Sequence, residues 1–237
     1  MIGRLALKIL GIETSSSIFS LCLSEELNII YEVRQNRELF PAQHGSIFTE
    51  TERVMKNLNG ENLAAIVVSI GPGMFTSLRV GLSLAKGLSL ALNVPLVAVN
   101  TLDAIGLSIA DLYKPFLSQN FGFIGAVINA YQNELYAAIY KNNERVSEYL
   151  LTTPGNLFNI LERLTGKSTP VFIGGPGVEA LKKEKTPQTL QISYLDKTFF
   201  LTSSMLIPLA LPSIRQKKFC NPDLLEPFYL KKTAAEK

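Results

Sequence analysis

The segment SIGPGMFTSLRVG, Ser69 to Gly81, joins an apolar run to a helical pattern through two glycines that flank a proline. The run before it, LAAIVVSI at residues 63–70, is rich in β-branched residues, which is typical of a strand buried on both faces. The helical pattern continues to residue 92, and VPLVAVN (residues 94–100) then predicts a second buried strand. The segment therefore predicts a strand–helix–strand crossover of an α/β fold.

The residues before this crossover predict three strands in an antiparallel meander. KILGIETSSSIFSLCL, residues 8–23, holds two apolar runs around a polar turn, and LNIIYEVRQ follows a charged turn at Glu25 and Glu26. PAQHGSIFTETERVMKNL then predicts a helix that begins near Pro41. The first hundred residues are expected to run β-β-β-α-β-α-β.

The second half repeats this order more loosely. FGFIGAVINA and ELYAAIYKN predict strands around a turn, GNLFNILERLTG predicts a helix, and PVFIGGPGVEALKK predicts a strand, a glycine-rich turn and a helix. We interpret the chain as a duplicated α/β unit, with a first lobe at 1–104 and a smaller, divergent second lobe with a C-terminal tail at 105–237. Pro208 and Pro212 are expected to interrupt a C-terminal helix.

Composition favours an ordinary globular protein, because 47% of the 237 residues are hydrophobic and 18% are charged. The net charge is +3, and the lysines fall in pairs and triplets that are typical of solvated surface rather than of a nucleic-acid-binding face. The two cysteines match no metal-site spacing, which favours a reducing, cytoplasmic compartment. Residues 199–214 are apolar but too short to cross a bilayer, and the charged N-terminus lacks a signal-peptide core, so no membrane or export segment is expected.

The turn at Gly71, Pro72 and Gly73 precedes a helix, a setting in which backbone N–H groups bind anions. The segment has neither the Gly-Lys-Ser/Thr end of a P-loop nor the Gly-x-Gly-x-x-Gly of a dinucleotide site. Glycine also permits a tight turn without any ligand. On spacing alone we favour a structural turn, and the alternative is an anion site with Thr76 and Arg79 as contacts.

The helix after the turn carries a ridge of small residues. Ser77, Gly81, Ala85 and Ser89 are four residues apart and lie on one side. Gly81 and Gly87 each cost about 1 kcal/mol relative to alanine inside a helix, so they suggest close packing. Two readings stay open: packing within the same domain, which the sequence alone slightly favours, and a docking face for a partner.

Catalytic side chains are sparse. His44 is the only histidine, so the chain lacks a histidine pair for a metal, and the residue is more typical of a helix start than of a catalytic base. No cluster of carboxylates appears in the sequence. Glu13, in the turn GIETSSS, follows a predicted strand, and its role is left open. We predict no catalytic residue and no metal ligand.

Five segments carry a family resemblance: ILGIETSSS, SIGPGMFTSLRVGLSLAKGL, VPLVAVNTLDAI, INAYQNELYAAIY and EPFYLK. In this order they resemble the bacterial TsaB (YeaZ) family of tRNA threonylcarbamoyladenosine biosynthesis proteins, along residues 8–231. The Gly-Pro-Gly-x-Phe-Thr-x-Leu-Arg-x-Gly part is the most specific. The resemblance implies an actin-like ATPase (ASKHA) fold of two ribonuclease-H-like lobes of mixed β-sheet flanked by helices. It also implies a non-catalytic subunit, an inactive paralogue of TsaD.

In that family, the first-lobe helices pair with those of TsaD or, in the isolated protein, with a second TsaB. The resemblance implies that residues 42–58 and 76–92 form this interface here. The implied protein partners are a TsaD-like protein, a TsaE-like ATPase and, when the chain is alone, a second copy of the chain. The resemblance implies that tRNA is contacted only indirectly through the complex and that the chain does not bind a membrane. The implied interface residues are His44, Ile47, Phe48, Thr51, Met55, Ser77, Gly81 and Ala85.

The resemblance also bears on catalysis. TsaD carries a metal-binding His-x-x-x-His pattern where this chain has Thr101 and Ile105, and an isoleucine side chain cannot ligate a metal. The resemblance therefore implies that this chain binds no metal and no cofactor. It implies that ATP or ADP binds only at the complex with TsaD. The alternatives are an active metal-dependent, glycoprotease-like hydrolase or ATPase of the same fold, and a stand-alone tRNA-binding protein, which a net charge of +3 disfavours.

The chain departs from the family pattern at three places. Met74 stands where the family has Ser or Ala, and Ser77 stands where the family has Gly. Asn129-Ala130-Tyr131 stands where the family has Asp-Ala-Arg. The last change weakens any assignment of nucleotide or tRNA binding to that segment.

Overall fold

The computed structural model describes most of the chain, namely residues 7–36, 47–58, 62–114, 122–166, 169–195 and 201–231. The chain divides into two compact units, one of residues 1–100 with 202–228 and the other of residues 101–201 with 229–237. The predicted lobe boundary after residue 104 therefore lies after residue 100. The assignment of residues 202–228 to the second lobe is corrected, because they pack in the first unit.

The first unit is built on a five-stranded sheet in the order β3-β2-β1-β4-β5. The first three strands are antiparallel, and β4 and β5 run parallel to β1. Helix α1 follows β3, and α2 joins β4 to β5, so the predicted order of elements is confirmed. The bounds are β1 (Lys8–Glu13), β2 (Ile18–Glu25), β3 (Asn28–Asn36), α1 (Ile47–Lys56), β4 (Ala65–Gly71), α2 (Phe75–Leu92) and β5 (Leu96–Asn100).

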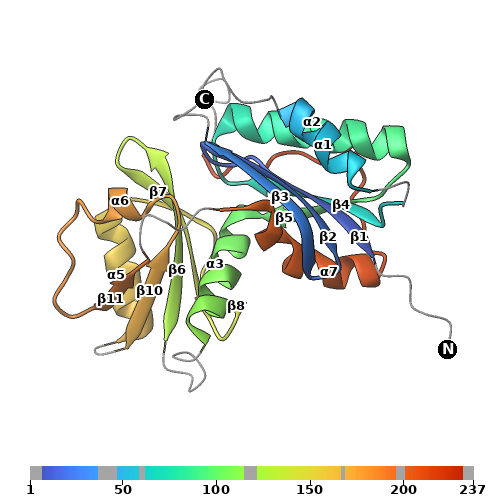
Figure 1. The fold of residues 1–237 in the computed structure, drawn as a ribbon. Coiled ribbons are helices and arrows are strands. Elements are labelled where there is room, and N and C mark those ends of the chain that lie inside the picture. The colour runs from blue at the N-terminus through green and yellow to red at the C-terminus, as the bar shows by residue number, and fades with distance from the viewer. Residues whose placement is uncertain are drawn as a thin grey trace, which may run out of the picture. The chain divides into compact units, whose positions relative to one another are not determined.

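Helices cover both faces of this sheet: α1 and α2 lie on one face and α7 (Ile207–Arg215) lies on the other (Figure 1). For this reason five successive residues of β4, Ala65 to Ser69, are buried, and Ile66, Val67 and Val68 have no exposed surface. The continuous apolar run in the sequence thus reflects a central strand covered on two sides.

The apolar segment after residue 201 folds in spite of its two prolines. A short 3₁₀ helix, η1 (Ser203–Leu206), leads directly into α7. Pro208 lies in the first turn of α7, where a proline removes no helical hydrogen bond. Pro212 lies inside the helix, which nevertheless continues to Arg215. The expected interruption is therefore corrected.

Hydrogen bonds from distant residues hold this C-terminal segment in the first unit. The Glu32 carboxylate on β3 accepts a hydrogen bond from the Ser204 backbone N–H at 3.1 Å. The Cys220 N–H donates to the Leu96 carbonyl at 2.9 Å, and the Phe228 N–H donates to the Ile70 carbonyl at 2.7 Å. The two residues of each pair are so far apart in the sequence that no local pattern could predict the contact.

The second unit holds a six-stranded mixed sheet in the order β11-β10-β6-β7-β8, with β9 paired to β7. The strand pair β6–β7 is confirmed, and it turns through Gln132 and Asn133, which both have positive φ, as a two-residue hairpin turn requires. The bounds are α3 (Thr101–Leu112), β6 (Phe123–Tyr131), β7 (Glu134–Lys141), β8 (Glu144–Arg145), β9 (Leu150–Thr152), α5 (Pro154–Thr165), β10 (Pro170–Gly174), α6 (Val178–Leu181) and β11 (Gln191–Tyr194).

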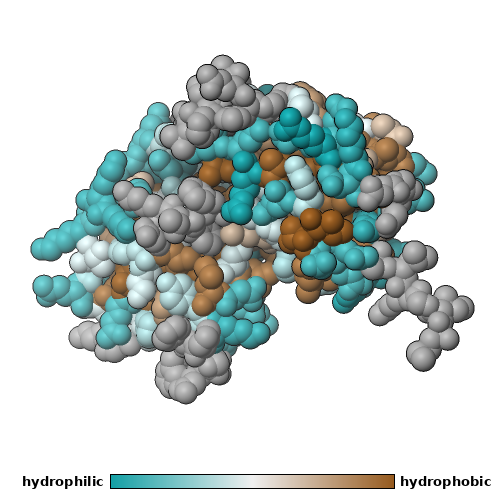
Figure 2. Space-filling view, in the orientation of Figure 1, coloured by the Kyte–Doolittle hydropathy of each residue, from teal (hydrophilic) through white to brown (hydrophobic). Residues whose placement is uncertain are grey.

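In the view of Figure 2, hydrophobic residues of the described part show in areas between hydrophilic ones. Within the described residues, none of the helices has the length and apolar character needed to cross a membrane.

Candidate protein-interaction surface

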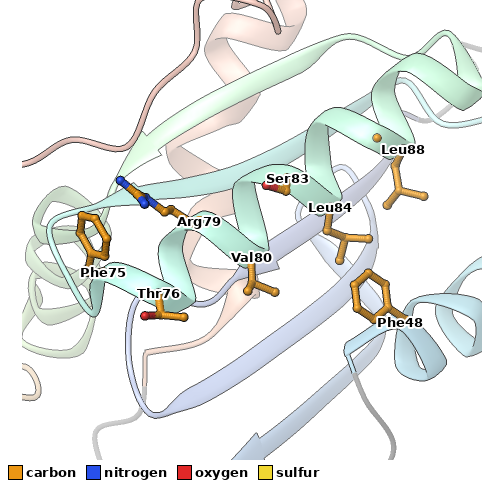
Figure 3. A pocket seen from close by; sticks show the side chains of 9 residues that line it. Phe48, Phe75, Thr76, Arg79, Val80, Ser83, Leu84 and Leu88 are labelled. Atoms are coloured by element: carbon orange, nitrogen blue, oxygen red, sulfur yellow. The ribbon is translucent and has the colours of Figure 1, made fainter.

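A groove of about 570 Å³ lies between α1 and α2 on the outside of the first unit. Val80, Leu84 and Leu88 project from α2 at four-residue intervals, and they point toward Phe48 on α1 (Figure 3). The remaining lining residues are Phe75, Thr76, Arg79, Ser83 and Gly87. We call this surface the α1–α2 groove.

The groove is apolar and open. Phe48 is 63% exposed and Phe75 is 38% exposed, which is unusual for two aromatic side chains that flank one hollow. Val80, Leu84 and Leu88 are only partly buried and pack by their inner side against the core of the unit. A contiguous apolar hollow of this kind is typical of a surface that receives another protein.

Arg79 is the only charged residue among those that line the groove. Its guanidinium carbon lies 3.9 Å from the centre of the Phe75 ring, so the cation stacks on the aromatic face at the N-terminal end of α2. Arg79 and Thr76, predicted as anion contacts of the glycine turn, both lie in the lining of the α1–α2 groove.

The ridge of small residues lies on the opposite side of α2. Ser77 is 3% exposed, Ala85 has no exposed surface, and Gly81 is buried. A Cβ atom on Gly81 would lie 2.9 Å from Thr14 Cγ2, so the helix rests directly on the end of β1. The prediction that Ser77, Gly81 and Ala85 contact a partner is therefore wrong, because these residues pack inside their own unit.

The residues of α1 that were predicted to form the interface are also partly buried and partly exposed. Ile47 and Thr51 are 6% and 5% exposed, and the Thr51 hydroxyl donates to the Ile47 carbonyl at 2.7 Å, so neither is available to a partner and their assignment is corrected. Met55 is half-buried against the core, and only Phe48 stands on the outer face. His44 lies outside the described residues.

The Gly-Pro-Gly turn is packed against the β1–β2 turn. Gly71 has a φ of +106°, which favours glycine, and a Cβ atom on Gly73 would collide with the Ser15 backbone. The Met74 N–H donates to the Ser15 carbonyl at 2.7 Å. Pro72 is buried between the two glycines. These contacts account for the two glycines without a ligand and favour the structural reading.

Glu13 is the one strongly buried carboxylate at the end of β1, and it has no exposed surface. One oxygen accepts hydrogen bonds from the Ser15 backbone N–H and hydroxyl, each at 2.5 Å. The other oxygen has no hydrogen-bond partner among the described residues. Burial raises the pKa of Glu13 above its ordinary value, although the hydrogen bonds from Ser15 oppose this.

The positions at which the resemblance places a metal pair do not fit a metal ion. Thr101 and Ile105 lie on α3 with no exposed surface, and Ile105 carries no donor atom. Among the described residues, no group of three or more His, Cys, Asp or Glu side chains lies close enough together to hold a metal.

Five residues that line the groove were not predicted from the sequence, namely Val80, Ser83, Leu84, Gly87 and Leu88. The signal was present, because Val80, Leu84 and Leu88 are spaced by four as regularly as the small ridge. The spacing did not show whether the side of α2 with the small residues or the side with the larger apolar residues faces the sheet.

Comparison with known proteins places the chain in a family. The model of the TsaD family, tRNA N6-adenosine threonylcarbamoyltransferase, matches residues 44–222. The tRNA N6-adenosine threonylcarbamoyltransferase of Kosmotoga olearia is 29% identical over 200 residues, which are 76% of this chain and 58% of the relative. The tRNA threonylcarbamoyladenosine biosynthesis protein TsaB of Bacillus subtilis is 27% identical over 175 residues, 70% of each chain. This chain thus spans little more than half of the transferase but most of the TsaB protein.

Two solved structures from Pseudomonas aeruginosa share the fold. YeaZ superposes with a TM-score of 0.70 at 19% identity, over 94% of this chain and 100% of its own. An uncharacterized protein with similarity to peptidase YeaZ gives 0.71 at 21% identity, over 95% and 100%. The expected actin-like ATPase fold, with two mixed sheets flanked by helices, is confirmed, and so is the resemblance to TsaB. Since the family model spans well over half of its length, the chain belongs to the TsaD family of tRNA N6-adenosine threonylcarbamoyltransferases.

Proposed function

We propose that this chain is a non-catalytic, TsaB-like subunit needed to form N6-threonylcarbamoyladenosine at position 37 of tRNA, and that its α1–α2 groove binds a TsaD-like enzyme. The groove is the observation that carries the proposal. It exposes Phe48 and Phe75 beside an apolar wall of α2, and an aromatic anchor in an apolar hollow is the usual centre of a protein–protein contact.

The side chains of the second unit support a role without catalysis. Thr101 and Ile105 offer no metal-binding pair, and the described residues hold no other candidate metal cluster. A TsaE-like ATPase and tRNA belong to the proposed assembly, with ATP or ADP bound at the junction of this chain with the TsaD-like enzyme. The active hydrolase or ATPase of the same fold remains the alternative, and turnover by the pure chain would favour it.

The test is to mix the purified chain with the TsaD-like enzyme of the same organism and to measure binding by calorimetry, with and without ATP. We expect a complex at micromolar concentration. In the variant Phe48→Ser binding should weaken at least about tenfold, because exposed aromatic anchors contribute about 2 kcal/mol or more.

Leu27→Ser is the matched control, because Leu27 is 60% exposed and belongs to the β2–β3 turn, outside the groove lining. It should bind as the unaltered chain does. Absence of any complex with the unaltered chain contradicts the proposed function. Equal binding by Phe48→Ser contradicts the groove assignment.

A further inference from the structure

Lysines fall into three groups along the sequence, and two of these groups lie beside carboxylates in the structure. Lys182 pairs with Glu179 at 3.5 Å, and Glu184 lies in the same exposed stretch. Lys231 pairs with Glu134 at 2.6 Å. A carboxylate next to an ammonium group offsets its charge, so these two groups exert little attraction on a polyanion.

The third group consists of Lys217 and Lys218, directly after α7, and its charge is not offset in this way. Both side chains are exposed, and among the described residues neither of them forms an ion pair. Arg215 adds a third cation, which pairs with Glu26 at 2.6 Å. Phe219, which follows the two lysines, is 39% exposed. We call Arg215, Lys217, Lys218 and Phe219 the α7 basic turn.

The backbone at Lys217 would suit a glycine better. Lys217 follows the C-cap residue Gln216 and has a φ of +54°, in the left-handed region. The Lys218 N–H donates to the Ser213 carbonyl at 2.9 Å, as in a Schellman motif, where glycine is the usual residue at the position of Lys217. Arg215 already places a cation in the last turn of α7, as the helix dipole favours. The fold therefore gains little from a lysine at position 217, which points to a role of its side chain outside the fold.

Contacts on both sides hold the α7 basic turn in place. The Cys220 N–H donates to the Leu96 carbonyl at 2.9 Å, so the residue after Phe219 is tied to the first residue of β5. The Arg215–Glu26 ion pair ties the other side to the β2–β3 turn. A turn that is already held in one conformation loses less entropy when its side chains contact a partner.

The α7 basic turn lies at the end of the first sheet that is away from the Gly-Pro-Gly turn. Leu96 pairs with Ile66 near the start of β4, whereas Gly71 is the last residue of that strand. None of the residues of the α7 basic turn lines the α1–α2 groove. Substitutions in the turn therefore leave the lining of the groove unchanged, and the two surfaces can be tested separately.

We propose that the α7 basic turn contacts tRNA directly, with Lys217 and Lys218 on phosphate groups and Phe219 against an unpaired base. Cations that neutralise phosphates beside an exposed aromatic ring that stacks on a base are the combination that binds single-stranded segments of RNA. An acidic protein surface would match the two cations but would leave the aromatic ring without such a role. This inference rests on the proposed function, in which tRNA is the substrate of the assembly, and it replaces the expectation that this chain contacts tRNA only indirectly.

The test measures the affinity of a labelled tRNA transcript for the complex of this chain with the TsaD-like enzyme, by fluorescence anisotropy at a series of salt concentrations. The variant Lys217→Gly with Lys218→Ala removes both cations and suits the backbone at position 217. We expect its tRNA affinity to fall at least about fivefold while its Tm does not fall. The slope of log affinity against log salt concentration should become shallower by about 1–2, because two phosphate contacts are lost.

Lys183→Ala with Lys185→Ala is the matched control, because it removes the same charge from an exposed stretch of the second unit. Its tRNA affinity should stay within about twofold of that of the unaltered chain. Phe219→Leu keeps an apolar side chain and removes the ring, so it should weaken binding without a change in the salt slope. Normal binding by Phe219→Leu would contradict the base contact.

The remaining outcomes separate the site from the proposed function. If the variant of Lys217 and Lys218 binds tRNA as well as the control does, the inference is overturned. If that variant keeps its tRNA affinity and binds the TsaE-like ATPase more weakly, the turn contacts an acidic protein surface and the assignment to RNA is wrong. If the chain and the enzyme form no complex, the proposed function fails. The same variants are then compared as isolated chains, where equal affinities for tRNA overturn the site as well.

Discussion

Gly81 on α2 lies directly against Thr14 at the end of β1, so that a Cβ atom on Gly81 would sit 3.0 Å from the Thr14 Cβ. The side of α2 that carries Gly81 therefore faces the sheet. Ser77 and Ala85 lie on this side and are buried, whereas Val80 and Leu84 form the wall of the α1–α2 groove. A side chain at position 81 would not fit this close approach.

The first prediction is that Gly81→Ala destabilises the fold. The added methyl group collides with Thr14, and overpacking of this kind costs about 1–3 kcal/mol. The free energy of unfolding in urea measures the effect. Gly87→Ala, in the same helix, is the control and should raise this free energy by up to about 1 kcal/mol. Equal stability of the two variants would show that α2 does not rest on Thr14.

The second prediction concerns the pH dependence of stability. Burial raises the folded-state pKa of Glu13 above the ordinary value of 4.5. Between that value and the raised pKa, the folded state holds a proton that the unfolded state has released. The free energy of unfolding should therefore fall as pH rises through this window, and below it Glu13 contributes no pH dependence.

Glu13→Gln removes this ionisation and keeps the shape of the side chain. We expect the variant to lose less stability than the unaltered chain as pH rises from 4.5 toward the raised pKa of Glu13, with a difference in slope of at most about 1.4 kcal/mol per pH unit. Urea unfolding at a series of pH values gives both curves. Parallel curves would mean that Glu13 is ionised in the folded state throughout this range.

The third prediction concerns Asp103 in the first turn of α3. Its two carboxylate oxygens accept hydrogen bonds from the Tyr140 hydroxyl at 2.7 Å and the Tyr149 hydroxyl at 2.6 Å. Burial raises the pKa of both tyrosines, so both hydroxyls stay protonated as donors at neutral pH. Tyr140→Phe should lower the free energy of unfolding by about 1.5–3 kcal/mol, the range for hydrogen bonds to charged groups.

Tyr149→Phe is the internal comparison for this site. Tyr149 is half-buried, whereas Tyr140 is only 5% exposed, so water replaces the lost donor more readily at Tyr149. We expect the smaller loss from Tyr149→Phe. The reverse order of the two variants in thermal unfolding would show that the exposure of the tyrosine does not decide the size of the loss.

The fourth prediction separates two roles for Arg79. Because its guanidinium stacks on Phe75 at the end of the α1–α2 groove, Arg79→Ala should weaken binding of the TsaD-like enzyme by about 0.5–1 kcal/mol, with or without ATP. Calorimetry in both conditions measures the two values. A loss that appears only with ATP would instead make Arg79 an anion contact, as one reading of the sequence predicts.

Local patterns were sufficient for most elements of the first unit. The β-branched run at residues 63–70 predicts β4 because only a strand covered on both faces is apolar at every position. The four-residue spacing of Ser77, Gly81 and Ala85 correctly indicates one side of a helix in close contact. The same spacing says nothing of what that side contacts, and the partner-facing reading of it was wrong.

The order of strands and helices in the first hundred residues, like the Gly-Pro-Gly turn and the family resemblance, could be read from the sequence, because each depends on residues that are close together in the chain. The fold alone shows that residues 202–228 complete the first unit and that α2 turns its small residues inward. Both depend on contacts between distant residues, such as Glu32 with Ser204 and Thr14 with Gly81. With the small residues of α2 turned inward, the α1–α2 groove remains on the outside.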